Sequence, residues 1–311
     1  MIYTCTLNPA IDLFVELEAF HPFVVNRTTA EYYQANGKGI NISFILKRMG
    51  IDSTAMGFLG GFTGRFIQET LQKEGIPTDF VKVAGITRVN TFVRTQDKEY
   101  KIVNRGPVIT PIEKKQILNK INQIKEGDVL FVSGSLPRGV PDEILVEIAR
   151  IAQKRGFRLI LDVSSKRLID CLPYRPYLIK PNDEELAALF GEKALTDEEI
   201  VKAAYQLLNR GVQNVLVSMG PKGALFINQD LALMATAPKG KVVNTACAGD
   251  SLLAAFTGSL ILGERVDMAL SFGVAAGSST AFSPGLSDLT DVPELIKQVQ
   301  IKELEHHKGG F

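Results

Sequence analysis

Short apolar segments alternate with helical patterns through the second half of the chain. One helical pattern begins near Pro141, carries its apolar residues on one face and ends at Gly156. Apolar strands joined by helices are typical of a mostly parallel sheet with helices on both faces, so we predict a three-layer α/β/α fold. Ligands bind such sheets at the carboxyl ends of the strands. The strands are predicted at residues 129–132, 158–163, 177–180 and 215–218.

Two early stretches interrupt this pattern with alternating apolar and polar residues. Residues 11–18 and 26–34 are rich in β-forming side chains, and residues 89–95 and 100–104 flank a polar turn, as in a hairpin. We interpret them as a small sheet that needs a partner for its apolar face, either as a lid or as a dimer contact. The predicted domains are a large α/β domain (residues 1–10, 36–87 and 106–311) and a small β-sheet lid (residues 11–35 and 88–105).

Charge and hydropathy argue against several classes of protein. The 311 residues have a formal net charge of +1, whereas nucleic-acid-binding proteins usually carry a basic excess. No apolar run reaches the ~20 residues that cross a bilayer, and the first residues do not resemble a signal peptide. Three widely spaced cysteines give no disulfide framework. We therefore expect a cytoplasmic protein without nucleic-acid or membrane partners.

The supply of histidine limits the possible chemistry. Only His21, His306 and His307 occur, and the last two lie in a polar tail. A histidine-ligated zinc site or a Ser-His-Asp triad would therefore depend on His21 alone. We expect catalysis to use carboxylates, basic side chains and backbone dipoles.

The strongest local signal is a run of small residues that leads into an apolar helix. Residues 244–250 read Asn-Thr-Ala-Cys-Ala-Gly-Asp. Consecutive N–H groups at a helix N-terminus, with the positive end of the helix dipole, stabilise a phosphate oxygen. Asp250 could be a general base beside this anion hole, or an ordinary cap that accepts hydrogen bonds from the backbone. The spacing alone favours neither interpretation.

Three further loops are expected at the same edge of the sheet. The glycines of residues 36–41 would let the backbone approach a ligand closely, and residues 218–223 could cover nucleotide phosphates or form a plain turn. Asn182 and Glu185 could face a hydrated Mg²⁺ from one side of a helix. An acidic first turn that complements the helix dipole is the more common cause of that spacing.

The sequence lacks the P-loop pattern Gly-x-x-x-x-Gly-Lys-[Ser/Thr], which excludes that type of phosphoryl transfer. Arg27, Arg88 and Arg105 lie in or beside the predicted lid. A lone surface arginine is usually solvated, but arginines on a lid over a cleft suit phosphate because the guanidinium fork matches its geometry.

Several motifs resemble those of one enzyme family. Residues 36–41, Asn-Gly-Lys-Gly-Ile-Asn, are similar to the Gly-Gly-Lys-Gly-x-Asn element of the PfkB (ribokinase-like) carbohydrate kinases. Residues 244–250 are similar to its second signature, Asp-Thr-x-Gly-Ala-Gly-Asp, and Asn182 with Glu185 match its Asn-x-x-Glu element. The resemblance covers nearly the whole chain. It implies a ribokinase-like three-layer α/β/α fold with a mostly parallel central sheet and a small β-sheet lid.

The sequence departs from these signatures at three positions. Asn36 replaces the first glycine of the first element, Asn244 stands where the family often has Asp, and Cys247 occupies the usual glycine position of the anion hole. Asn tolerates a left-handed backbone better than most residues, and the side chain of Cys is small. We therefore expect both turns to be kept.

Other segments resemble the branch of this family that acts on phosphosugars. Residues 6–12, Thr-Leu-Asn-Pro-Ala-Ile-Asp, and residues 133–137, Ser-Gly-Ser-Leu-Pro, resemble this branch, which comprises 1-phosphofructokinases, tagatose-6-phosphate kinases and the minor 6-phosphofructokinase. Residues 58–64 and the general run of the sequence look closest to bacterial 1-phosphofructokinase. The resemblance implies ATP-dependent phosphorylation of D-fructose 1-phosphate at its 6-hydroxyl group. Tagatose-6-phosphate kinase is the alternative, because both substrates are ketohexose monophosphates with one free hydroxymethyl group. A sugar-phosphate sensor without catalytic activity is the alternative from another class.

The resemblance also assigns roles to individual residues. Asp250 would accept the proton of the attacking hydroxyl, while the N–H groups of Ala248, Gly249 and Asp250 hold the phosphoryl oxygens. ATP and Mg²⁺ are the implied cofactors, and a homodimer through the lid sheet is the implied assembly. The other assignments are ATP contacts at Ser218, Gly220, Gly223, Lys180 and Gly249, sugar contacts at Asp12, Gly37, Lys38 and Asn41, sugar-phosphate contacts at Arg27, Arg88, Asn90 and Ser135, and Mg²⁺ contacts at Asn182 and Glu185.

Overall fold

The structure, a computed structural model, describes residues 1–305, so His306 and His307 lie outside the described residues. Its main element is a ten-stranded sheet. Across the sheet the strands are β14 (Ile301–Glu303), β13 (Ala232–Ala235), β12 (Ala224–Asn228), β11 (Asn214–Ser218), β10 (Leu178–Ile179), β9 (Arg158–Asp162), β8 (Val129–Ser133), β1 (Ile2–Thr6), β4 (Thr54–Leu59) and β5 (Thr78–Lys82). Neighbouring strands from β11 to β5 are parallel, which confirms the predicted mostly parallel sheet.

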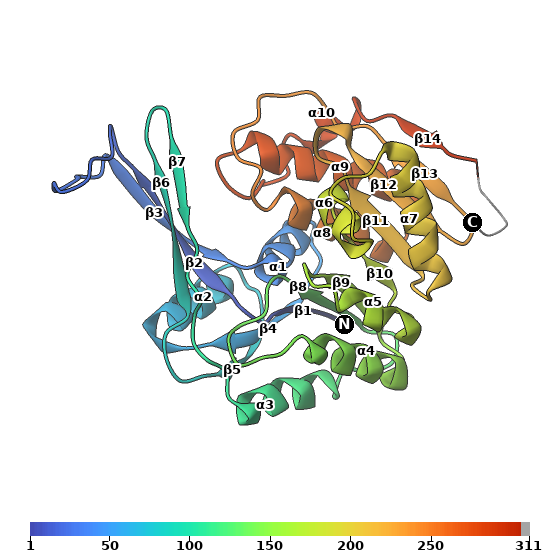
Figure 1. Cartoon of the computed structure of the whole chain (residues 1–311), viewed down its shortest axis with the longest axis horizontal. Coiled ribbons are helices and arrows are strands. Elements are labelled where there is room, and N and C mark those ends of the chain that lie inside the picture. Colours follow the sequence, from blue (N-terminus) through green and yellow to red (C-terminus); the bar gives the residue numbers. More distant parts are fainter. Residues whose placement is uncertain (306–311) are drawn as a thin grey trace.

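Helices cover both faces of this sheet (Figure 1). One face packs against α3 (Pro111–Ile121), α4 (Glu143–Arg155), α5 (Leu168–Cys171), α6 (Asp183–Leu189) and α7 (Asp197–Asn209). The other packs against α1 (Lys38–Arg48), α2 (Gly61–Lys73), α8 (Ala248–Ile261), α9 (Val266–Phe282) and α10 (Val292–Ile296). Because side chains alternate along a strand, Leu130 of β8 enters the first core and Phe131 the second. Within residues 1–305, no helix is long and apolar enough to cross a membrane.

Local sequence sets the ends of several helices. Thr196 and Glu199 cap the start of α7 reciprocally, each side chain accepting a hydrogen bond from the backbone N–H of the other. Gly156 ends α4 in the left-handed conformation, with φ of 77°. The same helix begins at Glu143, two residues after Pro141.

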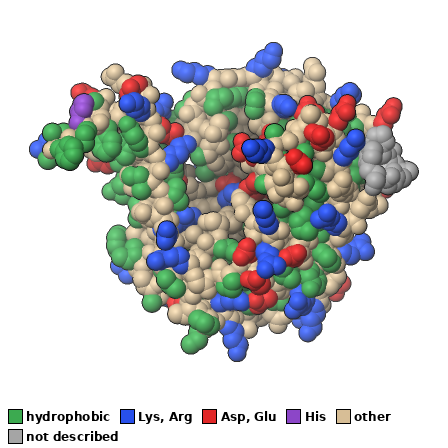
Figure 2. Space-filling view, in the orientation of Figure 1, with side chains coloured by type: hydrophobic (Ala, Val, Ile, Leu, Met, Phe, Trp, Pro, Cys, Tyr) green, Lys and Arg blue, Asp and Glu red, His purple; other side chains and the backbone are tan. Residues whose placement is uncertain are grey.

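A second, four-stranded sheet stands out from the body of the molecule (Figure 1). Its strands, in order, are β3 (Ala30–Asn36), β2 (Ala10–Glu16), β6 (Arg88–Arg94) and β7 (Glu99–Ile102). Ile11 and Ala35 at its base join α1 and α2 in a third apolar cluster. Its free end exposes hydrophobic side chains, and a hollow lies between it and the body (Figure 2). We refer to this sheet as the lid.

Two parts of the observed sheets differ from the sequence prediction. Strand β3 begins at Ala30 rather than at residue 26, because the side chain of Asn26 binds the backbone of His21 and Val24 and closes a loop instead. The large sheet also contains strands that the sequence does not predict: the parallel strands β1, β4 and β5 beyond β8, and the antiparallel strands β12, β13 and β14 beyond β11.

Candidate active site

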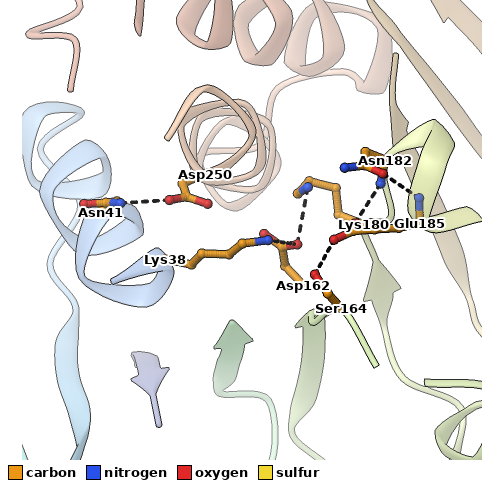
Figure 3. A network of polar contacts seen from close by, with 8 residues as sticks. All are labelled: Lys38, Asn41, Asp162, Ser164, Lys180, Asn182, Glu185 and Asp250. Carbon is orange, nitrogen blue, oxygen red and sulfur yellow. Dashed lines mark hydrogen bonds and ion pairs between the residues drawn. The ribbon is translucent and has the colours of Figure 1, made fainter. Parts of the chain in front are cut away.

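The carboxyl ends of the parallel strands and the N-termini of α1 and α8 meet at one edge of the large sheet. Lys38 opens α1, Asp162 ends β9, and Lys180 follows β10. Asp250 lies in the first turn of α8, and Figure 3 shows these four side chains facing one another. The alternation of strands and helices therefore brings residues more than 200 positions apart into one cluster.

Asp250 is a buried carboxylate at the start of α8. Its side chain is 4% exposed, and its Oδ2 accepts a hydrogen bond from Nδ2 of Asn41 (2.8 Å). Among the described residues no side chain caps α8, so Asp250 is not the ordinary helix cap. Burial and the charge of Asp162 raise the pKa of Asp250 to about 7, against the lowering effects of Lys38, Asn41 and Lys180. A carboxyl group with this pKa can take up and release a proton near neutrality.

A chain of amide side chains connects Asp250 to the lid. Asn41 Nδ2 also donates to Asn36 Oδ1 (2.8 Å), and Asn36 Nδ2 in turn donates to Asp12 Oδ2. The other oxygen of Asp12 accepts from Asn90 Nδ2 (2.8 Å). Burial raises the pKa of Asp12, although these bonds and the charge of Arg88 oppose the change. The lid residues Asp12 and Asn90 and the body residues Asn41 and Asp250 thus form one polar network.

Two lysines share a single buried carboxylate beneath this network. Oδ1 of Asp162 lies 2.9 Å from Lys38 Nζ and 3.3 Å from Lys180 Nζ. Burial alone would lower the pKa of Lys38, but the carboxylates of Asp162, Asp250 and Glu185 outweigh it and raise that pKa. A Cβ placed on Gly249 would lie 3.3 Å from Lys180 Nζ. One ammonium group is therefore in contact with the start of α8.

Three buried side-chain oxygens of this region have no hydrogen-bond partner within residues 1–305. They are Oδ1 of Asn41, Oγ of Ser133 and Oδ2 of Asp162. Buried polar atoms in folded proteins are nearly always paired with protein, water or ligand. Their concentration at this edge indicates a site that binds polar groups from outside the chain.

Asn182 and Glu185 form a capping box at the start of α6. Asn182 Oδ1 accepts from the N–H of Glu185 (2.6 Å), and Glu185 Oε2 accepts from the N–H of Asn182 (3.0 Å). Glu185 Oε1 accepts from the hydroxyl of Ser164. The described residues contain no cluster of three acidic, His or Cys side chains suited to a resident metal ion. The pair fits a hydrated Mg²⁺ held mainly by phosphate oxygens, because oxygens that accept one bond retain a second lone pair.

Arg88 is tied to the backbone at the base of the lid. Its guanidinium donates to the carbonyl oxygens of Asn8 (2.8 Å), Asn104 (3.2 Å) and Pro9 (3.4 Å). A guanidinium has five N–H donors, so these contacts leave donors for a ligand. Arg88 thus lies next to Asp12, and its contacts join the lid to the loop after β1.

The other predicted phosphate contacts lie farther out. Arg27 is exposed in the loop between β2 and β3, and Arg105 is exposed after β7. In the described part of the chain, no hydrogen bond or ion pair connects either arginine to the polar network. Ser135 is exposed after β8 and accepts a hydrogen bond from Asn8 Nδ2 (3.2 Å).

The loop after β11 crosses the same edge of the sheet. The N–H of Ser218 donates to the carbonyl of Pro181 (3.1 Å), which places the loop beside Asn182. A short 3-10 helix, η2 (Gly220–Lys222), follows. A Cβ on Gly223 would lie 1.9 Å from the carbonyl oxygen of Ala235, whereas a Cβ on Gly220 would meet nothing within 4 Å. Gly223 is thus required by the fold, while Gly220 faces open space.

Asp162 and Asn36 were not assigned a function from the sequence. Asp162 ends a buried strand, and an acidic residue at the carboxyl end of a central strand was the available signal. The sequence motif involves Asn36 only through its backbone, as the replacement of a glycine. It ends β3 and is not among the residues with positive φ, so the left-handed tolerance of Asn is not used there. Its side chain instead links Asp12 to Asn41.

Cys247 has the backbone conformation that glycine would favour. It precedes α8 with φ of 65°, and its Sγ lies 3.2 Å from Nδ2 of Asn41. Burial, with the nearby charges of Asp250 and Asp12, raises the pKa of its thiol well above the ordinary value. The expected turn is therefore kept in the presence of a Cβ, at a cost of about 1–2 kcal/mol for an L-residue in this region.

Replacing Cys247 with Gly is expected to raise the free energy of unfolding by up to about 1 kcal/mol, because relief of strain exceeds the entropy lost by a glycine. Urea unfolding of the Cys247→Gly and Cys247→Ala variants measures the effect. The Ala variant retains the strained backbone and is expected to gain no stability. Equal stability of the two variants would show that the conformation is not strained.

Comparison with known proteins shows which family the whole chain resembles. The profile of the pfkB family carbohydrate kinases matches residues 6–293. A D-tagatose-1-phosphate kinase of Bacillus licheniformis is 55% identical over 98% of this chain and 100% of its own length. A 1-phosphofructokinase of Bacillus subtilis is 37% identical over the same shares. Phosphofructokinase-2 of Escherichia coli, solved in complex with substrates and products, is 31% identical and covers 95% of this chain and 98% of its own with a TM-score of 0.89.

Proposed function

Because this chain belongs to the pfkB family of carbohydrate kinases, we propose that it transfers the γ-phosphoryl group of ATP to the 6-hydroxyl group of a ketohexose 1-phosphate. The products are the ketohexose 1,6-bisphosphate and ADP. The observation that carries the proposal is the buried carboxyl group of Asp250, with a pKa of about 7, near the buried Lys180 and the partly buried Lys38 at the N-terminus of α8. A protein that only binds sugar phosphates needs no such group.

Asp250 acts as the general base. It accepts the proton of the 6-hydroxyl as that oxygen bonds to the γ-phosphorus and the bond to the ADP oxygen breaks. A positioned base contributes typically 10²–10⁴-fold to the rate. Positioning and charge neutralisation contribute more, because the transition state of phosphoryl transfer is loose. The N–H groups of Ala248, Gly249 and Asp250, with Lys180 beside them, hold the transferring oxygens.

The sugar and the nucleotide lie on the two sides of Asp250. Asp12, Gly37, Lys38 and Asn41 bind the sugar hydroxyls, and Arg27, Arg88, Asn90 and Ser135 bind the phosphate already on the sugar. Ser218, Gly220, Gly223, Lys180 and Gly249 contact ATP. Asn182 and Glu185 hold Mg²⁺, which neutralises charge on the ATP phosphates when bound.

The first ketohexose to test is D-tagatose 1-phosphate. The name of the relative with 55% identity supports it, while D-fructose 1-phosphate, implied by the sequence motifs, is supported by relatives of 37% and 38% identity. The two sugars differ only in the configuration at C4. A site that hydrogen-bonds a hydroxyl can distinguish them, because the wrong epimer leaves a buried polar group unpaired.

The lid closes over the sugar and excludes water, which would otherwise accept the phosphoryl group. The exposed apolar side chains of the lid support a homodimer through this sheet, because a small sheet needs cover for its apolar surface. They include Phe20, Phe23, Val24, Val25, Tyr33 and Ile102.

Measuring ADP release with Mg²⁺, ATP and a panel of sugars tests the proposal. The panel contains the 1-phosphates and 6-phosphates of D-tagatose and D-fructose, with unphosphorylated fructose as the control. We expect kcat/KM for a 1-phosphate to exceed that for either 6-phosphate at least about tenfold. Turnover of the 6-phosphates alone would overturn the substrate class. Tight binding without turnover would favour a sensor, and equal affinity for fructose and fructose 1-phosphate would contradict the phosphate subsite.

A further inference from the structure

Asp162 is the least exposed charged side chain of the cluster, at 1%. Its Oδ1 forms ion pairs with Lys38, at the start of α1, and with Lys180, which follows β10. These two elements do not follow one another in the chain. Among the described residues these two lysines are the only partners of the carboxylate, since Oδ2 has none. The neighbouring Ser133, its register partner on β8, also has an unpartnered hydroxyl. Within residues 1–305, only the two lysines therefore pair with this carboxylate.

Stability alone does not explain a buried group of this kind. Taking Asp162 and Lys180 out of water costs several kcal/mol per ion, and apolar replacements of buried ion pairs are often as stable or more so. Two ammonium groups and one carboxylate also leave a positive charge, which Asp250 balances only when it is ionised. Such an arrangement favours an incoming anion.

The ammonium groups of both lysines meet at Asp162, close to the start of α8, where the phosphoryl group would be transferred (Figure 3). Lys180 Nζ lies against Gly249 at the start of α8, and Lys38 lies between Asp162 and the Asp250 side of the cluster (Figure 3). Since a lysine side chain is long and flexible, an ammonium group needs a fixed partner to be held in one place. Asp162 is that partner for both.

We propose that Asp162 is a positioning residue that holds Lys38 and Lys180 side by side at the N-terminus of α8, where they meet the transferred phosphoryl group. This inference rests on the proposed function. It assigns to the fully buried carboxylate the task of orienting the two cations, and to the cations the contact with the reacting group.

The groups that face Asp250 make this role measurable. Asp162 raises the pKa of Asp250, whereas Lys38 and Lys180 lower it, and the Cys247 thiol next to them is uncharged at neutral pH. Removing the charge of Asp162 therefore moves the acid limb of the pH–kcat profile to lower pH. Removing the charge of Lys38 moves it to higher pH. A residue with a purely structural role would change stability without moving this limb.

The experiment compares Asp162→Asn, Lys38→Met and the double variant with the parent protein, using thermal unfolding to check folding. For Asp162→Asn we expect kcat to fall about a hundredfold, as for a misplacement of about 1 Å, and the acid limb to move down by roughly one pH unit. For Lys38→Met we expect the acid limb of the pH–kcat profile to move to higher pH. Asp128→Asn is the matched control: its carboxylate precedes β8, outside the polar network, and pairs with the N-terminal amine of Met1. It is expected to keep the kcat and the acid limb of the parent.

The double variant covers the case in which Asp162→Asn does not fold, because it removes one charge of each sign. Compared with Lys38→Met alone, the double variant is expected to have a kcat about tenfold lower, because Lys180 is no longer held in place. The acid limb of its pH–kcat profile is expected at lower pH than that of Lys38→Met. The proposal is wrong if Asp162→Asn keeps both the kcat and the acid limb of the parent. It is also wrong if the double variant keeps both the kcat and the acid limb of Lys38→Met.

ATP binding separates this inference from the proposed function. If the folded parent phosphorylates no sugar of the panel, the proposed function fails, and calorimetric titration with ATP and Mg²⁺ then tests Asp162. We expect Asp162→Asn to bind ATP about tenfold more weakly than the parent does, a difference of ~1.4 kcal/mol in binding free energy. Unchanged affinity in that titration would overturn the role of Asp162.

Discussion

Asp250→Asn is expected to lower kcat by about 10²–10⁴-fold, the range for loss of a general base. The KM for the phosphosugar is expected to stay within about threefold, because the Asn carbonyl can still accept the hydrogen bond from Asn41. The parent itself is expected to lose activity below about pH 7, where Asp250 takes up a proton. Initial rates between pH 5 and 9 measure both effects. A loss of less than about tenfold would show that another group accepts the proton.

The same substitution is expected to stabilise the protein at pH 8. The folded protein holds the proton of Asp250 more tightly than the unfolded chain does, since burial raises the pKa from 3.8 to about 7. Ionised Asp250 is therefore destabilising above pH 7, and this effect is lost as the pH falls toward the unfolded value. We expect roughly 2–4 kcal/mol of added stability at pH 8. At pH 4 the gain should nearly vanish, and a gain that is the same at both pH values would contradict burial as the cause.

Gly223→Ala is expected to destabilise the protein by about 2–5 kcal/mol, because it combines a strained backbone with a steric clash. Gly223 has φ of 105°, and the added Cβ would lie 1.9 Å from the carbonyl oxygen of Ala235 in β13. Gly220→Ala is the matched control. Gly220 has φ of 52° and open space around it, so the expected loss is only about 1 kcal/mol.

Kinetics of the same two variants separate the fold from the nucleotide site. If the loop after β11 covers the ATP phosphates, Gly220→Ala raises the KM for ATP while the protein stays folded. Urea unfolding and ATP-dependent rates measure the two effects. If both variants lose a similar amount of stability, the close contact between the loop and β13 is not the reason that glycine is needed at position 223.

The parallel part of the fold could be predicted because its signal is local. Apolar strands and one-sided helices leave a periodic trace, and both sheets were found in this way. Other strands of the large sheet, among them β1, β4 and β12, are not predicted, because a short apolar run has the same pattern in a buried strand and in a buried helix segment. The start of β3 was misplaced because Asn26 closes a loop through hydrogen bonds that periodicity does not record.

The candidate site was predictable only where its residues fall in motifs. Asp250, Lys38 and Asn41 were named from runs of residues that enter helices, and they lie together in the structure. The sequence offered no contact that would single out Asp162, because its partners Lys38 and Lys180 come from distant segments. Side chains such as Asn36, which connect others, become visible only when their neighbours are known.

The amide chain from Asp12 through Asn36 and Asn41 to Asp250 has a consequence for how tightly a sugar can be held. Apart from Oδ1 of Asn41, the atoms that link these groups are already bonded to one another in the free protein, so a hydroxyl that binds to one of them must displace an internal bond before it forms its own. Exchanging one hydrogen bond for another changes the free energy little. Affinity should therefore come mainly from the charged end of the sugar, and deoxy analogues that keep that end should bind almost as well as the natural compound while reacting more slowly.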